Sequence, residues 1–377
     1  MNPQQIKRCL LTIFLLLALP LCVIPQEDTT SCSLLFTGDI MGHDTQIQSA
    51  YNDSTGEYHY DTCFFAIRSI LRSTDITVGN LEVTLAGEPY KGYPQFSTPD
   101  GMALALKKAG VDVLVQANNH ALDRGKTGLE RTLGVLDLLE MPHAGTYRNE
   151  EERDSTYPLL IEKNNIRICL LNYTYGTNGI PVPEPTVVNL IDRGIIKKDL
   201  EKARMMNPDK IIVSVHWGTE YEPLPNAQQR SLAEFLFGEG VDIIIGSHPH
   251  VIQPMERYPA RDGLKERVVV WSTGNFISNQ KTPGTDGGAL IYLRLEKTDS
   301  ICTIAEAGYL LCWVYRPVVN YRQQFFVLPA AEYEHDPSLF PEKSHYQRMR
   351  EFILESRTHL QRHNTGFPEI IPGVKAE

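Results

Sequence analysis

The chain has 377 residues, of which 42% are hydrophobic and 22% are charged, so it is long enough to bury a large core. Its formal charge of −10 argues against nucleic acid as a partner, because binding to phosphates relies on clustered Lys and Arg. No basic tract interleaved with aromatic residues is present, so no nucleic-acid partner is expected.

The first 25 residues have the pattern of a signal peptide or an N-terminal membrane anchor. Lys7 and Arg8 precede the apolar run CLLTIFLLLALPLCVIP, and the polar stretch QEDTTS follows it. The alternative is a core helix, but such a helix is normally amphipathic, whereas this run is apolar on every side. We therefore expect an exported protein of the cell envelope or periplasm, either secreted or membrane-anchored. Cys22 offers a site for lipoprotein attachment, although the usual small residue does not precede it.

Strand-like and helix-like patterns alternate along most of the chain. Strands are predicted at 33–40, 75–79, 111–116, 157–162, 166–172, 211–216, 243–247 and 268–273, with hairpins over 288–296 and 300–328. Helices are predicted at 61–73, 100–109, 129–141, 190–206, 228–240 and 344–363. The very apolar strands favour sheets that are covered on both faces. The fold class is therefore α/β, with one domain over 30–330 and a C-terminal helical extension over 331–377.

The cysteines do not have the spacing of a structural zinc site or a redox pair. Cys169, within IRICLLNY, has the pattern of a small buried hydrophobic residue. Cys302 and Cys312 could face each other on a hairpin, and we considered a disulfide between them because oxidising compartments permit it.

Six of the predicted strands end at residues that bind metals or transfer protons. His248 and His250 follow IIIG, and His216 follows IIVSV, so three imidazoles are offered to a divalent metal. Asp39, after LLFTG, and Glu82, after ITVGNL, supply carboxylates, one of which could bridge two metals. Each residue alone has a plain alternative, such as a core histidine, a helix cap or a surface charge. Because ligands of α/β proteins bind at the carboxyl ends of strands, the set predicts one metal site.

The segment ANNHALD adds a group for proton transfer. Asn119 offers a carbonyl oxygen to a metal, and His120 would protonate a leaving group or stabilise developing charge. Asp123 is placed to orient His120, and its alternative role is the cap of the following helix.

Three more residues are candidates for substrate binding. Arg124 could meet a carboxylate or phosphate, or it could be a solvated charge, while Glu220 in HWGTEY and Asn275 in STGNF lie in the motifs that carry the ligands. The segments 86–99 and 173–189 are rich in aromatic residues, proline and glycine, and we expect them to flank the cleft.

Taken together, GDIM, GNLE, ANNHALD, HWGTEYE, GSHPHVIQP and STGNF resemble the CapA-type poly-γ-glutamate capsule proteins of the calcineurin-like metallophosphoesterase superfamily. The resemblance covers residues 33–280, with the motifs in the same order. It implies a four-layer α/β/β/α sandwich of two mixed sheets, with a site for two divalent ions such as Mn, Zn or Fe. His120 would be the catalytic histidine, and the implied ligands are Asp39, Glu82, Asn119, His216, His248 and His250.

Two motifs depart from the wider superfamily. Met41 stands where the usual Asp-x-His motif has its histidine, and Glu82 stands where the second motif has an aspartate. These changes could leave one metal weakly held or the site mononuclear. They argue against an ordinary phosphoesterase and suit the CapA-like branch, whose substrate is thought to be an amide-linked polymer.

Three functions follow from these features. The first is an exported metal-dependent hydrolase or amide-transfer enzyme of capsule or exopolymer biosynthesis, with metal-activated water and His120 as general acid. The second is a phosphatase or phosphodiesterase with the same centre. The third is a non-catalytic subunit of a membrane-bound machinery that makes or exports the polymer. The expected substrate is an anionic polymer or another compound with amide or phosphate groups.

Overall fold

The protein is described by a computed structural model, which covers residues 29–261, 265–299 and 301–370. The expected leader and Cys22 lie outside these residues. Within the described parts of the chain, none of the helices has the length and apolar character needed to cross a membrane.

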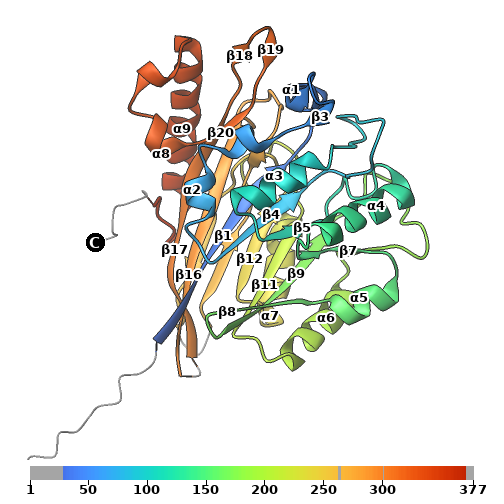
Figure 1. Ribbon diagram of the computed structural model, residues 1–377. Coiled ribbons are helices and arrows are strands. Elements are labelled where there is room, and N and C mark those ends of the chain that lie inside the picture. Colours follow the sequence, from blue (N-terminus) through green and yellow to red (C-terminus); the bar gives the residue numbers. More distant parts are fainter. Residues whose placement is uncertain (1–28, 262–264, 300, 371–377) are drawn as a thin grey trace, which may run out of the picture.

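Two mixed sheets form the centre of the molecule (Figure 1). The larger sheet contains β1 (Thr29–Ile40), β4 (Ile76–Leu81), β5 (Val113–Val115), β6 (His143–Ala144), β15 (Asn275–Ile277), β16 (Gly287–Thr298), β17 (Ile301–Tyr315) and β20 (Phe326–Pro329). Its order is β20-β17-β16-β1-β4-β5-β6, with β15 also paired to β1. The smaller sheet contains β8 (Leu159–Lys163), β9 (Ile166–Thr174), β11 (Lys210–His216), β12 (Ile243–Ser247), β13 (Met255–Tyr258) and β14 (Arg267–Val270). Its order is β13-β14-β12-β11-β9-β8.

Short ribbons lie outside these sheets. They are β2 (Tyr51–Asn52) with β3 (Glu57–Tyr58), β7 (Thr146–Tyr147) with β10 (Val187–Val188), and β18 (Val318–Val319) with β19 (Arg322–Gln323). The helices are α1 (Asp44–Ala50), α2 (Arg68–Leu71), α3 (Gly101–Ala109), α4 (Gly125–Leu138), α5 (Glu150–Thr156), α6 (Arg193–Met205), α7 (Ala227–Gly238), α8 (Ala330–Tyr333) and α9 (Lys343–His363).

Three hydrophobic cores separate four layers. Phe36 of β1 and Ile212 of β11 belong to the core between the sheets. Leu106 of α3 packs in the core outside the larger sheet, and Leu236 of α7 packs in the core outside the smaller one. The structure therefore confirms the α/β class and the four-layer α/β/β/α sandwich of two mixed sheets that the sequence implied.

Strand β11 shows why its sequence is apolar at nearly every position. Ile212 faces the core between the sheets, whereas Val213 and Val215 contribute to the core under α6 and α7. Successive side chains of a strand point to opposite faces, so a strand covered on both sides needs apolar residues on both. All seven residues of β11 are buried.

Two expectations from the sequence are corrected. The predicted helix 61–73 is a 3₁₀ turn at Asp61–Phe64 followed by the short α2, because donors such as the Phe65 amide bond three residues back rather than four. Cys302 and Cys312 lie on the same strand, β17, and all five described cysteines are free. Ten residues of extended strand separate them by roughly 33 Å, so they cannot form a disulfide with each other.

The C-terminal segment packs against the sandwich. Phe352 and Ile353 of α9 are buried in the same core that lies between the sheets. Beyond α9, Thr365 pairs with Glu256 of the smaller sheet and Glu369 pairs with Tyr309 of the larger one. This tail therefore contacts both sheets.

Arg357 on α9 holds this segment together. Its guanidinium donates to the carboxylates of Glu334 at 2.6 Å and of Glu369 at 2.7 Å. Burial by itself would raise the pKa of Glu334, but the hydrogen bonds from Arg357 outweigh that effect and lower it. Glu334 is only 3% exposed, so its charge depends on these partners.

We expect Glu334→Gln to destabilise the protein by about 3 kcal/mol at pH 7, because it removes the buried carboxylate that pairs with both Arg357 and Arg350 and leaves Arg357 only Glu369. The pKa of Glu334 is lower in the folded than in the unfolded chain, where it is about 4.3. The contribution is therefore present above that pH and is lost as the pH falls through the folded value. Urea unfolding should show that the difference in unfolding free energy between Glu334→Gln and the wild type is smaller in acid than at pH 7. The control Glu332→Gln, at an exposed neighbouring position, should change the unfolding free energy little at either pH.

Candidate metal centre

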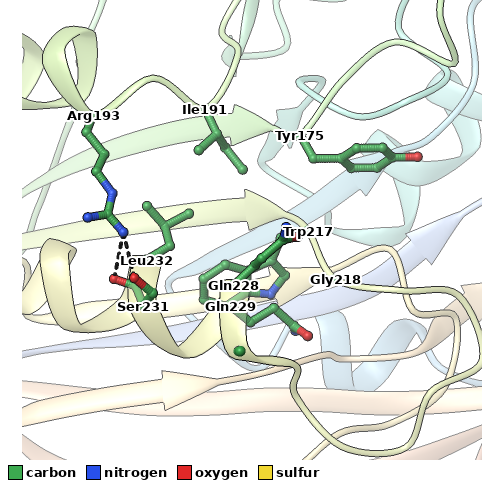
Figure 2. Close-up of a pocket in the computed structure, with 10 residues that line it drawn as sticks. Tyr175, Ile191, Arg193, Trp217, Gly218, Gln228, Gln229, Ser231 and Leu232 are labelled. Atoms are coloured by element: carbon green, nitrogen blue, oxygen red, sulfur yellow. Dashed lines mark hydrogen bonds between the residues drawn. The ribbon is translucent and has the colours of Figure 1, made fainter.

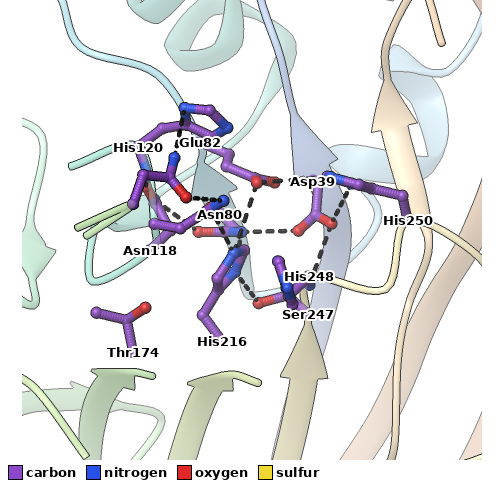
Figure 3. Close-up of polar contacts among 12 residues, drawn as sticks. Asp39, Asn80, Glu82, Asn118, His120, Thr174, His216, Ser247, His248 and His250 are labelled. Carbon is purple, nitrogen blue, oxygen red and sulfur yellow. Dashed lines mark hydrogen bonds and ion pairs between the residues drawn. The ribbon is translucent and has the colours of Figure 1, made fainter. Parts of the chain in front are cut away.

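The carboxyl ends of the central parallel strands of both sheets bring the predicted ligands to one place (Figure 3). Asp39 lies near the end of β1 and Glu82 directly after β4. His216 is the last residue of β11, and His248 and His250 follow β12. These five side chains are at most 4% exposed.

Close backbone approach and unusual backbone conformations shape the site. The Asp39 amide donates to the Gly274 carbonyl at 2.9 Å. A Cβ on Gly38 would lie 2.2 Å from that same oxygen, so only glycine permits the approach. His248 and His250 have φ values of 97° and 58°, which side-chain-bearing residues rarely adopt and which concentrate at functional sites.

The ligands form two overlapping groups that share one carboxylate. Glu82, His216 and His248 make one group, and Asp39, Glu82 and His250 make the other, with ligand atoms within 4.8 Å of one another in each. Glu82 Oε1 lies 3.5 Å from His216 Nε2 and 3.8 Å from His250 Nε2. His250 Nδ1 lies 3.2 Å from Asp39 Oδ2. This arrangement suits a divalent-metal site to which Glu82 would contribute from both groups.

The protonation states also fit metal ions. Both oxygens of Glu82 are buried and accept no hydrogen bond from the described residues. His248 Nδ1 is also buried and has no hydrogen-bond partner among these residues. Burial and the nearby Asp39 carboxylate raise the pKa of Glu82 well above its usual value. Burial lowers the pKa of His248 to about 3 and that of His216 well below normal, so both rings are neutral and can ligate. A cation at this position would compensate the buried charge of Glu82.

Asn119 also lies at the centre, with its Oδ1 2.9 Å from His216 Nε2. The structure thus brings together all six predicted ligands, and their coordination of a metal stays a prediction.

Two asparagines that the sequence analysis passed over support the ligands. Asn80 Nδ2 donates to Asp39 Oδ1 at 2.7 Å, and Asn118 Nδ2 donates to the Leu81 carbonyl at 2.8 Å. The hydroxyl of Ser247 lies 2.9 Å from His216 Nδ1 and orients that ring. A signal for all three was present, because they are polar residues within or next to otherwise apolar strands that carry the motifs.

His120 and Asp123 form a buried pair at the rim of the cluster. His120 Nδ1 lies 2.7 Å from Asp123 Oδ2, and the same oxygen accepts from the Phe96 amide at 2.7 Å. Burial raises the pKa of Asp123, whereas the bond to His120 acts against that rise. With Nδ1 held by Asp123, Nε2 is the ring nitrogen that His120 can offer to a substrate.

The three predicted substrate-binding residues occupy different environments. Glu220 and His120 line two adjoining cavities of about 420 and 230 Å³. Asn275 turns inward, where its Oδ1 lies 3.1 Å from His250 Nδ1 and its Nδ2 donates to Gln280. Arg124 lines neither cavity and donates to the Pro89 carbonyl at 3.5 Å. Their substrate-binding roles stay predictions.

The loops expected to flank the cleft do so. Tyr93, Pro94 and Gln95 line the 420 Å³ cavity, and so do Asn178 and Ile180. These residues come from the segments 86–99 and 173–189.

A further cavity of about 470 Å³ lies behind Tyr175 (Figure 2). Tyr175 lines it, and its ring centre is 4.6 Å from that of His248, so this side chain contacts both the cavity and the ligand cluster. Trp217, next to His216, lines it as well. Arg193 reaches across it to donate to the Ser231 hydroxyl at 2.8 Å.

The family model described as bacterial capsule synthesis protein PGA_cap matches residues 33–280. The chain belongs to this family. It is 26% identical to the capsule biosynthesis protein CapA of Bacillus anthracis and 31% identical to the PGA biosynthesis protein CapA of Bacillus subtilis (strain 168). Each alignment covers 72% of this chain. The first spans 66% of the Bacillus anthracis protein, and the second spans 69% of the Bacillus subtilis protein.

Among solved structures, this PGA_cap protein is similar to the NAD nucleotidase of Haemophilus influenzae, at 11% identity and a TM-score of 0.47, covering 89% of this chain and 68% of that one. It is also similar to the calcineurin-like phosphoesterase YfkN of Bacillus subtilis, at 14% identity and a TM-score of 0.43, covering 88% and 99%.

Loss of His248 and His250 should remove metal from this PGA_cap protein, because each ligand group contains one of these imidazoles. We expect about two transition-metal ions per chain in the wild type and few or none in a His248→Ala/His250→Ala double variant. Elemental analysis after supply of Mn²⁺ or Zn²⁺ measures this. The control variant His335→Ala/His363→Ala, whose histidines lie outside these groups, should retain the metal content of the wild type.

Glu82→Gln should change stability in opposite directions with and without metal. In the presence of Mn²⁺ the variant should melt at a lower temperature, because it binds the stabilising ions less tightly. After treatment with a chelator it should be more stable than the wild type by roughly 1–3 kcal/mol, because the wild type must protonate Glu82 to bury it without partners, whereas the amide is neutral from the start. Thermal melts of both proteins in both conditions test this, and destabilisation in both would contradict it.

Proposed function

We propose that this protein is an exported, metal-dependent hydrolase or amide-transfer enzyme that acts on an amide-linked capsule polymer such as poly-γ-glutamate. The observation that carries the proposal is the His120–Asp123 pair, held at the rim of a ligand cluster for two ions and open to the same cleft. The capsule context is supported by the family and by relatives named for capsule and PGA biosynthesis. Export is supported by the leader pattern of residues 1–25.

Two bound divalent ions of a kind that accepts imidazole and carboxylate ligands, such as Mn, Zn or Fe, would supply Lewis acids and lower the pKa of water at the site. Asp39, Glu82, Asn119, His216, His248 and His250 would hold them. Asn80 and Ser247 keep Asp39 and His216 in place, and Asn275 does the same for His250.

His120 provides the proton that an amide substrate requires. An amine leaves a tetrahedral centre poorly unless its nitrogen is protonated, so a general acid must stand near it. Asp123 accepts from Nδ1 of His120 and thereby fixes the ring and its tautomer, which leaves Nε2 directed to the leaving nitrogen. The tight contact of the His120 ring with the edge of Phe96 limits its rotation further.

The surroundings of the cleft suit a polymer. The two adjoining cavities lined by His120 and Glu220, of about 420 and 230 Å³, leave room for residues of a chain next to the bond that is cut or transferred. Although the protein as a whole is acidic, bound cations would reverse the field locally and attract an anionic polymer. Through its leader, the protein would work next to the membrane-bound machinery that makes the polymer.

A phosphatase or phosphodiesterase is the second candidate, because two ions bridged by a carboxylate also stabilise phosphoryl transfer. Met41 weighs against it, since a thioether is a poor ligand for the hard ions that phosphate enzymes use.

The leaving group separates the two candidates. His120→Asn should reduce the hydrolysis of γ-linked glutamate oligomers about 10²–10⁴-fold, because an amine needs the proton. The same change should reduce the hydrolysis of p-nitrophenyl phosphate much less, since nitrophenolate leaves without one. Elemental analysis should show that metal content is unchanged. Turnover of phosphate esters alone would favour the second candidate, and absence of turnover on both substrates with metal bound would favour a non-catalytic subunit of the polymer machinery.

A further inference from the structure

Glu220 approaches the ligand cluster from the solvent side. One of its carboxylate oxygens, a nitrogen of His248 and a nitrogen of His250 all lie within 4.8 Å of one another. This third group shares His248 with the first ligand group and His250 with the second. Glu220 is exposed, whereas the ligands beneath it are buried, so its carboxylate lies across the open side of both positions.

The loop that carries Glu220 is fastened to the histidine loop. The Tyr221 amide donates to the carbonyl of Pro249, which stands between His248 and His250, at 2.8 Å. Gln253 Nε2 donates to the Glu222 carbonyl at 2.8 Å, and Asn226 Nδ2 donates to the Thr219 hydroxyl at 3.2 Å. Hydrogen bonds on both sides of Glu220 therefore hold it over the two imidazoles.

The two buried groups have few ligands for the ions they would hold. Asp39, Glu82 and His250 provide three, and Met41, which lines the same cavity as His250 and Glu220, offers only a thioether. Divalent ions of this class take at least four ligands. Glu220 is the carboxylate that faces this cavity, and its neighbour Glu222 belongs to none of the ligand groups found among the described residues.

We propose that Glu220 is a further metal ligand, which closes the centre from the solvent side and supplies the oxygen that Met41 cannot. This rests on the metal centre of the proposed function and replaces the substrate-binding role predicted for Glu220. Since a carboxylate is a harder ligand than an imidazole, its addition shifts the preference of the site toward Mn²⁺ relative to Zn²⁺. As an exposed ligand, Glu220 can also move aside when a substrate oxygen enters.

The test compares Glu220→Gln with the matched control Glu222→Gln in protein stripped of metal by a chelator. Calorimetric titration with Mn²⁺ should show at least about a tenfold loss of affinity at the weaker site in Glu220→Gln and no loss in Glu222→Gln. Titration of Glu220→Gln with Zn²⁺ should show a smaller loss of affinity than titration with Mn²⁺. Introducing Met41→His into Glu220→Gln should restore binding, with Zn²⁺ gaining more than Mn²⁺, because an imidazole then lines the cavity.

The outcomes separate this proposal from the function on which it rests. Equal Mn²⁺ affinity in Glu220→Gln and the wild type would overturn the ligand role, and a raised KM with unchanged metal binding would assign Glu220 to the substrate. A wild-type protein that binds no Mn²⁺ or Zn²⁺ would refute the metal centre itself. Melting temperatures of the stripped proteins control for folding, and we expect them to agree because Glu220 is exposed.

Discussion

The rest of the centre depends on the carboxylate of Glu82, which is fully buried and belongs to both of the buried ligand groups. A charge in such a place is costly unless cations or hydrogen-bond donors compensate it, and the described residues offer its oxygens no donor. The imidazoles of His216 and His248 are neutral, so they cannot compensate it either. Metal ions are the partners that fit this combination of a shared carboxylate and neutral histidines.

The sandwich places these groups by aligning the ends of strands from two sheets. The core between the sheets keeps β1 and β4 opposite β11 and β12, so ligands from distant parts of the sequence meet at one edge. The contact of Gly38 with the Gly274 carbonyl then draws Asn275 next to Asp39, with which it pairs across β1 and β15. The apolar layers thus give the polar centre a rigid frame, and the asparagines around it keep the ligands oriented.

The position of His120 beside the ligand cluster also bears on which leaving groups the site would favour. His120, fixed by Asp123, lines the same two cavities beside the cluster as Glu220. A positioned proton donor matters most when the leaving group is a strong base, which links this geometry to amides more closely than to activated phosphate esters.

The sequence alone predicted most of the central strands and helices in their order, and it predicted the six polar side chains that meet at the centre, whose role as metal ligands stays a prediction. Strands buried on both faces are apolar at successive positions, so polar residues such as His216 and His250 stand out where these strands end. The same pattern marks Asn80 and Asn118 as unusual, but it could not assign them a supporting role, because a polar residue inside an apolar motif carries no sign of what it will contact.

Relationships between distant segments were decided by the tertiary structure. Cys302 and Cys312 share a strand because the hairpin turns at Asp299 rather than between them, and turn position depends on pairing with β16. Glu220 meets His248 and His250 only because backbone bonds join their two loops. The local pattern of a sequence reports which face of an element is buried, whereas contacts between elements depend on packing and backbone pairing that no local pattern contains.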